Sequence, residues 1–583
     1  MELKQLLLGN EAIARGAVEA GVRVVSSYPG TPSTEITEVI AVKSDPDKVH
    51  VEWAPNEKVA LEVAIGASIA GGRALSCMKH VGLNVAADPL FTVAYTGVNG
   101  GLVVVVADDP GMHSSQNEQD SRFYARSAHI PMLEPADSAE CREMLLRAFD
   151  MSEEYDTPVL VRVTTRIAHA RSLVEVSGER ELPLKDYAKD VRKYVMMPGN
   201  ARGRHLVVEE REKRLAADAG NMSDLNIVEM RGKKLGVVTS GAAYQYVREA
   251  LPDASTLKLG MVYPLPMDLI QDFASKVDEL VVIEDMEPFF EDAIKAAGIA
   301  CSGKDKTGLQ GELFVRRIQT QFAGAPEPGP QETQGIPQRP PVLCPGCPHR
   351  AVFYVLSKLK LTVCSDIGCY TLGALPPLSG VDTVVCMGAS ISMAHGFEKA
   401  RGAEQAQKTV AVIGDSTFLH SGITGLIDVV YNSGHSTVLI LDNSTTGMTG
   451  HQDNPATGRD ARGNPAPQLD LIKLCEAVGI HRVKLVDPYD MKKLEATIKE
   501  ETAYDGPSVI IAQRPCALLK KERATPLAID TEKCRRCGAC MRIGCPAIIK
   551  EGKQPRIDAA LCVDCGLCTR MCSFDAIGKG DAQ

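Results

Sequence analysis

The last 50 residues of this 583-residue chain contain eight cysteines in two closely spaced groups. Each group opens with three cysteines separated from one another by two residues and closes with a fourth a few residues later. Disulfides are not expected, because no signal peptide is recognised and thiols stay reduced in the cytosol. Thiolates at this density are expected to converge on metal. The groups are Cys534, Cys537, Cys540 and Cys545, then Cys562, Cys565, Cys568 and Cys572.

Zinc sites also use cysteines two residues apart, but they rarely use two such triplets that are each followed by a fourth cysteine. The spacing resembles that of a bacterial-type ferredoxin with two [4Fe–4S] clusters, in which the fourth cysteine of each group binds the other cluster. Two departures are a first loop of four residues before Cys545 and Ser573 in the usual place of proline. The resemblance implies one cluster on Cys534, Cys537, Cys540 and Cys572 and another on Cys545, Cys562, Cys565 and Cys568.

Length and composition bound the remainder of the chain. A chain of 583 residues predicts roughly three to five domains. Hydrophobic content of 44% with 24% charged residues is ordinary for a globular protein, and a net charge of −10 argues against nucleic-acid binding. No apolar run reaches the ~18 residues that would cross a bilayer, so we expect a cytoplasmic protein.

Two large parts of the chain alternate short, Val-rich apolar runs with helical patterns. Such strands predict α/β domains whose parallel sheets are covered on both faces. The strands expected in the first part are Val22–Ser26, Val49–Trp53, Ala74–Met78, Leu102–Ala107 and Val159–Thr164. Those expected in the second part are Thr383–Met387, Thr409–Ile413, Thr437–Asp442 and Ser508–Ala512.

Changes in composition divide the chain into six segments. We expect a large α/β domain at 1–175, a charged linker at 176–232, a small α/β domain at 233–322, a Pro/Gly/Gln-rich linker at 323–341, a second large α/β domain at 342–522 and the cysteine-rich domain at 523–583.

Polar residues follow two successive strands of the second large domain. One strand ends in Gly414-Asp415-Ser416, and a Gly-rich turn and a helix over Thr424–Tyr431 are expected after it. The next ends in Asp442-Asn443-Ser444-Thr445, which places Asn443 28 residues after Asp415. Ligands bind at such carboxyl ends of parallel strands, and Mg²⁺ prefers oxygen ligands and phosphate. A magnesium diphosphate fits this pattern, although Gly-Asp after a strand is often only a turn.

The same residues resemble the thiamin-diphosphate motif, in which an Asp, an Asn and a backbone carbonyl two residues later bind Mg²⁺. The resemblance assigns these roles to Asp415, Asn443 and the Thr445 carbonyl, and it places Ser416 and His349 at the cofactor. Ser416 and Asp442 depart from the motif as they do in 2-oxoacid:ferredoxin oxidoreductases.

Four further cysteines match those oxidoreductases. The segment from Cys344 to His349 resembles the CPGCGH sequence that opens their diphosphate domain, with Pro348 in place of its second Gly. The resemblance implies a third [4Fe–4S] cluster, and the alternative is that these are ordinary buried cysteines. The implied ligands are Cys344, Cys347, Cys369 and Cys516.

The first domain offers the other half of a thiamin site. Enzymes of this superfamily place a Glu at the start of a helix against N1′ of the aminopyrimidine, and Glu57 matches that position. The loop Tyr28–Pro32 resembles their YPxTPSS loop, which turns Thr31 toward the substrate or the thiazolium. The plainer alternatives are a Glu stabilised by a helix dipole and a Pro/Gly-rich turn.

The order of these segments resembles the large subunit of the indolepyruvate:ferredoxin oxidoreductase family. The polar stretches His113–Arg122 and Thr446–Gln452 add to the resemblance, which spans nearly the whole chain. It implies two thiamin-binding α/β domains and the oxidative decarboxylation of an arylpyruvate, with coenzyme A capturing the acyl group and ferredoxin receiving the electrons. It also implies a small beta subunit with a gamma-type domain, in an α2β2 assembly.

Three alternative functions remain open at this point. The chain could act on another 2-oxoacid, because no residue identifies the substrate side chain. It could be a non-oxidative thiamin decarboxylase with a ferredoxin appendage, which coenzyme A dependence would distinguish. It could be an electron-transfer scaffold, but the joint presence of Glu57, Asp415 and Asn443 argues against that alternative.

Overall fold

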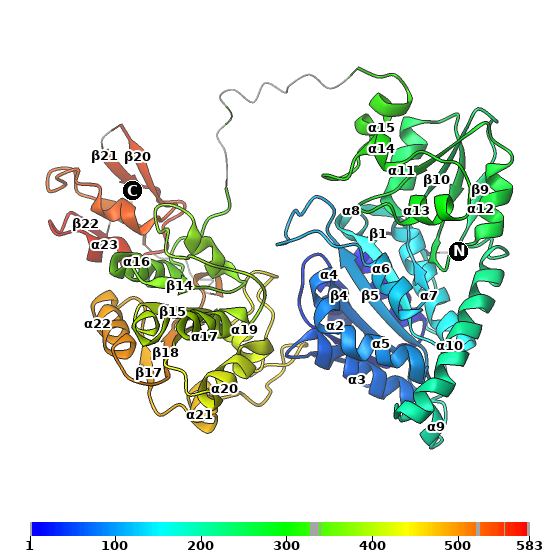
Figure 1. Ribbon diagram of the computed structural model, residues 1–583. Helices are drawn as coiled ribbons and strands as arrows, with labels where there is room; N and C mark the ends of the chain where they lie inside the picture. Colours follow the sequence, from blue (N-terminus) through cyan, green and yellow to red (C-terminus); the bar gives the residue numbers. More distant parts are fainter. Residues whose placement is uncertain (1–2, 327–335, 337–339, 520–524, 553, 580–583) are drawn as a thin grey trace. The chain divides into compact units, whose positions relative to one another are not determined.

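The computed structural model describes residues 3–326, 336, 340–519, 525–552 and 554–579. The chain divides into two units, residues 1–333 and 334–583 (Figure 1). The predicted α/β class with parallel sheets is confirmed. Within the described ranges, no helix combines the length and apolar character that crossing a bilayer requires.

The first unit is built on a seven-stranded sheet in which six neighbouring strands are parallel. Its central strands are fully buried, which explains why they read as unbroken apolar runs rather than alternating patterns. In spatial order the strands are β12 (Met261–Tyr263), β6 (Met132–Leu133), β7 (Val159–Thr164), β5 (Leu102–Asp108), β4 (Ala74–Lys79), β2 (Val24–Ser27) and β3 (His50–Trp53).

Helices follow most of these strands. The helix after β2 begins at Thr34, and the Ser33 hydroxyl before it donates to the Gly30 carbonyl rather than to the helix. A separate antiparallel pair joins β1 (Leu3–Leu8) to β8 (Arg171–Val176). The helices are α1 (Gly9–Glu19), α2 (Thr34–Lys43), α3 (Glu57–Ile69), α4 (His80–Val85), α5 (Ala87–Thr96), α6 (Arg122–Ala128), α7 (Ser138–Tyr155) and α8 (Thr165–His169).

The segment predicted to be a charged linker contains a 22-residue helix, α10 (Pro198–Ala219), after the short α9 (Val191–Tyr194). Its buried residues recur every three or four positions, so one stripe packs inward while the charges that dominate its composition face out. The buried Arg211 donates to the Ala94 and Asp156 carbonyls and ties the helix to the first domain.

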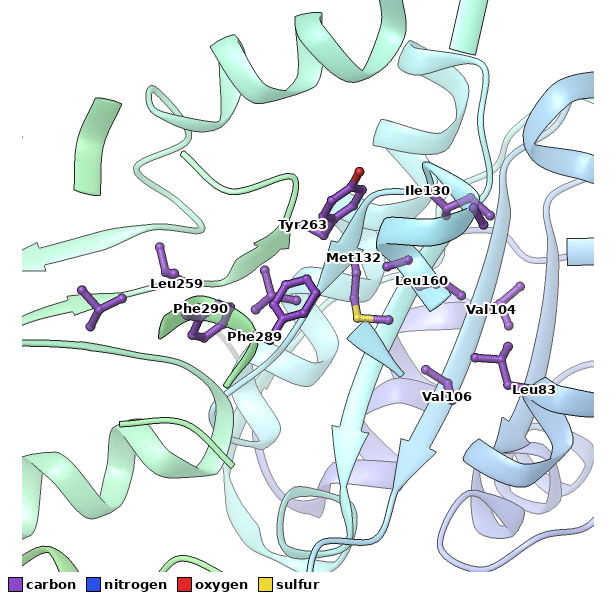
Figure 2. Close-up of a cluster of buried hydrophobic side chains, with 14 of the residues drawn as sticks. Leu83, Val104, Val106, Ile130, Met132, Leu160, Leu259, Tyr263, Phe289 and Phe290 are labelled. Carbon is purple, nitrogen blue, oxygen red and sulfur yellow. The ribbon is translucent and has the colours of Figure 1, made fainter. Parts of the chain in front are cut away.

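The small α/β domain shares a hydrophobic core with the first. Figure 2 shows Leu83, Val104 and Val106 in one cluster with Phe289 and Phe290. Strand β12 of the small domain also completes the large sheet, so residues 3–326 fold as one body. The small domain also has a sheet of its own, with the strands in the order β13 (Glu279–Ile283), β10 (Leu235–Thr239), β11 (Ser255–Lys258) and β9 (Ile227–Glu229). The helices of the small domain are α11 (Gly241–Ala250), α12 (Met267–Ala274), α13 (Phe289–Ala296), α14 (Lys304–Thr307) and α15 (Val315–Phe322).

The second unit has a five-stranded parallel sheet. Its strands in spatial order are β14 (Thr362–Cys364), β15 (Thr409–Gly414), β16 (Thr437–Asp442), β18 (Ser508–Gln513) and β17 (Val483–Val486). Its helical segments are α16 (His349–Leu359), η1 (Cys369–Ala374), α17 (Ala389–Arg401), α18 (Ala403–Ala406), α19 (Asp415–Thr417), η2 (Phe418–Gly422), α20 (Ile423–Tyr431), α21 (Leu471–Ala477), α22 (Met491–Thr502) and η3 (Ala517–Leu519).

Two local predictions in this unit are wrong. Thr383–Met387 is not a strand, because only Thr383 forms a single bridge, to Cys364, before the chain turns into α17 at Gly388; Val385 and Cys386 are exposed. No Gly-rich turn follows Ser416, because the chain is helical from Asp415 to Tyr431 through a π-helical segment. The glycines there serve packing: a Cβ on Gly422 would lie 2.5 Å from Ile413 Cδ1.

The cysteine-rich end of the chain contains two antiparallel strand pairs and two short helical turns. The predicted ferredoxin-like fold remains a prediction, although two pairs and two turns agree with an internal repeat. The pairs are β19 (Leu527–Ile529) with β22 (Ile577–Lys579) and β20 (Ile548–Glu551) with β21 (Gln554–Ile557), and the turns are η4 (Ala539–Ile543) and α23 (Leu567–Met571).

Candidate active site

Four neighbouring strands of the second unit deliver candidate residues to one edge of the sheet. The strands β14, β15, β16 and β18 lie side by side and are parallel, so their carboxyl ends meet at the same edge. The residues that follow them are Cys369, Asp415, Asn443 and Cys516. The sequence therefore folds so that the two predicted kinds of site, oxygen ligands and thiols, adjoin one another.

The three predicted magnesium ligands are in contact. With its NH₂ group turned toward them, Asn443 donates to Asp415 Oδ1 at 3.2 Å and to the Thr445 carbonyl at 2.9 Å. With the amide turned the other way, its oxygen takes that place, and three oxygens face each other. Three converging oxygens repel unless a cation lies between them. This donor set therefore fits Mg²⁺, which prefers oxygen ligands.

The charge on Asp415 is poorly compensated by the protein. Burial, and next the nearby Asp442, raise the pKa of Asp415 to about 7, and its Oδ2 atom has no hydrogen-bond partner among the described residues. Asp442 is instead well satisfied, because it accepts from the Ser444 amide and from Gln513 Nε2. A bound cation would supply the compensation that Asp415 lacks.

Four cysteines lie beside this oxygen cluster. A Cβ on Gly447 would lie 3.4 Å from Asn443 Nδ2 and 3.5 Å from Cys369 Sγ, and the Cys516 amide donates to the Asn443 carbonyl. Burial, and next the negative charges of Cys516 and Cys344, raise the pKa of the Cys369 thiol to about 11. Burial raises the pKa of Cys347 to about 12, with Cys369 and Cys344 adding to it. Cys344, Cys347 and Cys369 thus belong to or pack on one hydrophobic cluster, and Cys516 adjoins Asn443 beside it, while their role as cluster ligands stays a prediction.

The remaining predicted residues of this unit border the same edge. Thr446 Oγ1 donates to Ser416 Oγ at 3.0 Å, which joins the two ligand-bearing loops. His349 begins α16, and its ring packs edge-on against Tyr370 with centroids 5.9 Å apart. Burial lowers the pKa of His349 to about 4, so its imidazole is neutral.

The eight C-terminal cysteines surround two separate cavities. One is lined by Cys534, Cys537, Cys540 and Cys572, and the other by Cys545, Cys562, Cys565 and Cys568. These are the two ligand sets that the ferredoxin resemblance implies. Across the described ranges, no three His, Cys, Asp or Glu side chains converge on the position of a single metal ion. The thiols of each set line one cavity, and the choice of metal stays a prediction from the spacing.

In the first unit, Thr31 and Glu57 follow the adjacent strands β2 and β3. Glu57 is the first residue of α3, is 5% exposed and packs so tightly on Gly82 that a Cβ there would lie 2.6 Å from its Oε1. Next to Thr31, Gly30 packs on Lys79 Cβ. Both predicted residues therefore border the junction between β4 and α4.

Sequence reasoning missed a buried lysine at this junction. Lys79 is 8% exposed and donates to the Ser114 carbonyl. Burial lowers the pKa of Lys79, and the charge of the nearby Asp109 opposes this effect. Lys79 ends β4, the strand that pairs with β2 and so lies beside the loop of Thr31, and that position was the signal that could have identified it.

Two family models match the chain. The model of the thiamine pyrophosphate enzyme C-terminal TPP-binding domain matches residues 366–512, which include Asp415 and Asn443. The model of the thiamine-diphosphate-binding part of pyruvate flavodoxin/ferredoxin oxidoreductase matches residues 15–213, which include Thr31 and Glu57.

Curated relatives match nearly the full length. The indolepyruvate oxidoreductase subunit IorA of Archaeoglobus fulgidus is 40% identical over 98% of this chain and 97% of its own length. That of Methanothermobacter thermautotrophicus is 42% identical over 99% of this chain and 98% of its own. A solved 2-oxoglutarate:ferredoxin oxidoreductase from Magnetococcus marinus is 17% identical and covers 55% of this chain and 65% of its own, with a TM-score of 0.48.

Proposed function

Because this chain belongs to the family of indolepyruvate oxidoreductase IorA subunits, we propose that it is the catalytic subunit of an indolepyruvate:ferredoxin oxidoreductase. The reaction converts indole-3-pyruvate, coenzyme A and two oxidised ferredoxins to indole-3-acetyl-CoA, CO₂, a proton and two reduced ferredoxins. The position of Asn443 carries this proposal, because it contacts Asp415 and Thr445 and also adjoins Cys369 and Cys516. Such a position would join a diphosphate site to an electron acceptor at one sheet edge.

Thiamin diphosphate, when bound, supplies the nucleophilic carbon and the electron sink for decarboxylation. Asp415, Asn443 and the Thr445 carbonyl would hold the Mg²⁺ that anchors its diphosphate, with Ser416 and His349 beside it. The neutral His349 adds no charge to the site. Because these oxygens already lie together, little reorganisation free energy would be needed when the cofactor binds.

Glu57 would accept a hydrogen bond from N1′ of the aminopyrimidine and so favour the tautomer that removes the reacting proton. Its burial at 5% exposure excludes water from that bond. Thr31, at the end of the adjacent strand, would position the carboxylate of the 2-oxoacid. Both roles come from the family resemblance and from the strand ends on which the residues lie.

Three [4Fe–4S] clusters would carry the electrons away singly. Cys344, Cys347, Cys369 and Cys516 would hold the first, next to the cofactor. The two cysteine-lined cavities would hold the others. Thiolate ligands of this kind require reducing conditions, which agrees with a cytoplasmic location.

The relatives are named as one subunit of an oxidoreductase, which implies a partner. We propose a small beta subunit with a gamma-type domain, an α2β2 assembly and an external ferredoxin that receives the electrons.

An anaerobic assay of the chain with its partner subunit tests the proposal. Viologen reduction is followed with indolepyruvate, phenylpyruvate, pyruvate and 2-oxoglutarate, each with and without coenzyme A. We expect reduction that depends on coenzyme A and is fastest with the aryl substrates. Release of CO₂ and the aldehyde without coenzyme A and without viologen reduction would favour the non-oxidative decarboxylase. A preference for pyruvate or 2-oxoglutarate would reassign the substrate.

The variant Glu57→Gln tests the catalytic carboxylate. We expect at least a ~10²-fold loss of viologen reduction, because general acid–base groups typically contribute this much, with iron and thiamin content unchanged. Glu62→Gln is the matched control, because Glu62 lies on the same helix and forms an exposed pair with Lys58. Turnover retained by Glu57→Gln would remove the residue from the mechanism.

A further inference from the structure

A buried arginine lies where two of the cysteine sets approach each other. Arg350 is the second residue of α16 and is 2% exposed. Its guanidinium donates to four backbone carbonyls: to Leu343 and, at 3.1 Å, Cys344 on one side, and to Gly544 and, at 3.3 Å, Ile543 on the other. Leu343 and Cys344 begin the loop that carries Cys344 and Cys347. Ile543 and Gly544 directly precede Cys545. One side chain thus joins both loops.

Arg350 faces thiols from both sets. Burial lowers the pKa of Arg350, while negative charge on Cys545, Cys347, Cys344 and Cys565 raises it. Carbonyl dipoles satisfy its N–H groups but carry no net charge. A buried cation is costly unless negative charge lies nearby, and anionic iron–sulfur clusters on these cysteines would supply it.

The two loops are packed against each other around this arginine. Gly346, between Cys344 and Cys347, has φ +70°, and a Cβ on it would lie 2.4 Å from Val563 Cγ2 and 3.5 Å from Cys565 Cβ. Pro345 and Gly346 also form part of the wall of the Cys545/Cys562/Cys565/Cys568 cavity. Only glycine fits so close a contact at a positive φ.

The other C-terminal cavity has no such neighbour. The wall around Cys534, Cys537, Cys540 and Cys572 consists of residues 529–577 alone. None of the four carbonyls that accept from Arg350 belongs to this wall. The arginine therefore distinguishes between the two C-terminal sites.

We propose that Arg350 is a positioning residue between two clusters, the one on Cys344, Cys347, Cys369 and Cys516 (the Cys344 set) and the one on Cys545, Cys562, Cys565 and Cys568 (the Cys545 set). It holds the loops of these two sets together and, as a buried cation, favours the reduced state of both clusters. Reduction adds one negative charge to a cluster, and a fixed positive charge nearby raises its reduction potential. The cavity of the Cys534 set shares no wall residue with the loop of Cys344 and Cys347, so we expect the potential of its cluster not to shift. This inference rests on the proposed function, since it requires that all three clusters are present.

The test is an anaerobic redox titration of the complete complex, followed by EPR, with wild type, Arg350→Met and Arg350→Lys. In Arg350→Met we expect the midpoint potentials of two clusters to shift to more negative values while the third stays unchanged. Arg350→Lys, which keeps the charge, is expected to stay near wild type. Cys537→Ala, which removes one ligand of the Cys534 set, assigns the unshifted signal.

Arg556→Met is the matched control, because Arg556 lies in the same part of the chain but pairs on the surface with Glu551. It should leave all three potentials unchanged. Unchanged potentials in Arg350→Met, or an equal shift of all three clusters, would overturn the inference. If the methionine variant does not fold, the lysine variant decides, because lowered potentials despite the retained charge would refute the electrostatic role.

Iron content of the wild type separates this inference from the proposed function. Twelve iron atoms per chain are expected for three [4Fe–4S] clusters. About eight would show that one of the three cysteine sets holds no cluster, and the proposed cofactor content would then be wrong before any variant is made.

Discussion

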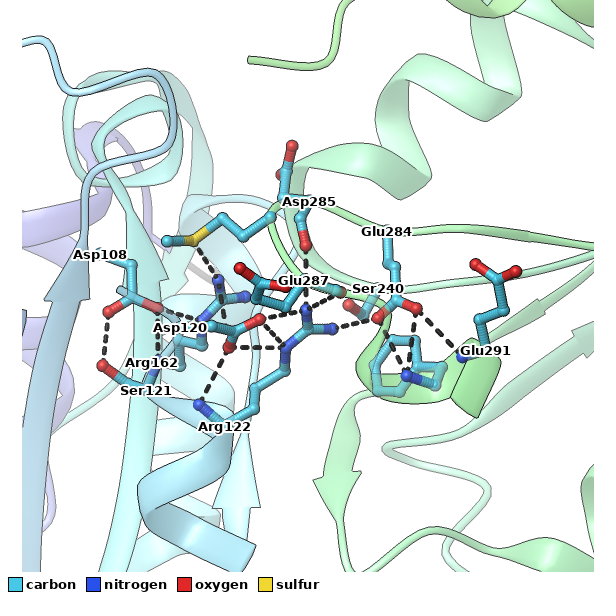
Figure 3. Close-up of polar contacts among 12 residues, drawn as sticks. Asp108, Asp120, Ser121, Arg122, Arg162, Ser240, Glu284, Asp285, Glu287 and Glu291 are labelled. Atoms are coloured by element: carbon cyan, nitrogen blue, oxygen red, sulfur yellow. Dashed lines mark hydrogen bonds and ion pairs between the residues drawn. The ribbon is translucent and has the colours of Figure 1, made fainter. Parts of the chain in front are cut away.

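Two buried polar clusters, one in each unit, are built on opposite principles. Figure 3 shows the first, in which Arg122 and Arg162 lie among the carboxylates of Asp108, Asp120 and Glu284. Every guanidinium there has ionic partners, at distances down to 2.5 Å. The second is the Asp415 cluster, where oxygens face oxygens and one carboxylate oxygen has no partner among the described residues.

The difference indicates what each cluster is for. A buried network whose arginines are all ion-paired fixes one arrangement of the chain, and the first cluster indeed joins Arg122 of the first domain to Glu284 of the small domain. A buried cluster with uncompensated charge lowers the free energy of unfolding, and a ligand that supplies the missing charge raises it again. Removing a charge should therefore damage stability at the first cluster and ligand binding at the second.

The largest expected effect is at Asp415. Asp415→Asn should lose retained thiamin diphosphate and Mg²⁺, with apparent affinity reduced by more than ~100-fold, because changes even to indirect metal contacts cost 10- to 100-fold. The ligand-free protein should be no less stable, since a poorly compensated charge is removed. Cofactor content after desalting and urea unfolding of the ligand-free chain measure the two effects.

The exposed Asp428 on α20 offers a matched control for this change. Asp428→Asn should retain the cofactor. Normal cofactor retention by Asp415→Asn would refute the magnesium assignment, and a marked loss of stability would show that the Asp415 cluster is structural like the first.

The next largest effect is at Arg162. Its guanidinium bonds Asp108 and Glu134, each at 2.6 Å, and Arg162→Met leaves both carboxylates buried without it. Removing one partner of a buried ion pair costs about 3–5 kcal/mol. Urea unfolding should show this loss in the free energy of unfolding.

Arg166 lies four residues further along and pairs with Glu312, but its side chain is 59% exposed. Arg166→Met should cost less than about 1 kcal/mol, because water already screens the pair. Equal losses for the two variants would mean that burial does not distinguish the two ion pairs.

The two clusters also show what could be predicted from sequence. Asp415 and Asn443 could be, because parallel strands carry short-range motifs to a shared edge. The paired network could not, because Arg122 and Glu284 are 162 residues apart and nothing local marks them as partners. Arg350 was missed for the same reason, since two of its carbonyl partners lie more than 190 residues away.

Local patterns also misled where the environment decides. Val384 and Val385 read as a strand, yet apolar β-branched residues cannot show whether a partner strand is present. Gly422 was expected to lie in a turn, yet it allows close packing on Ile413 within a helical segment. In both cases the packing partner is supplied from elsewhere in the chain.

The smallest expected effect sharpens the comparison, because it concerns the one carboxylate of the first region that resembles Asp415. Asp285 is 7% exposed, and its Oδ1 atom has no hydrogen-bond partner among the described residues. Burial raises the pKa of Asp285 from 3.8 to about 6, against the opposing charge of Arg162. The folded state therefore disfavours its charged form. The contribution of Asp285 to the free energy of unfolding is therefore greatest below its unfolded pKa of 3.8, and it is lost as the pH rises through about 6.

Asp285→Asn removes this dependence. Relative to wild type, the variant should gain about 1 kcal/mol in free energy of unfolding between pH 5 and pH 8, measured by urea unfolding at both values. Asp272→Asn, at an exposed position on α12 that pairs with Lys276, should show no such change. A pH-independent difference for Asp285→Asn would mean that the surrounding arginines compensate its charge fully. The first cluster would then be paired throughout, and the contrast with Asp415 would be complete.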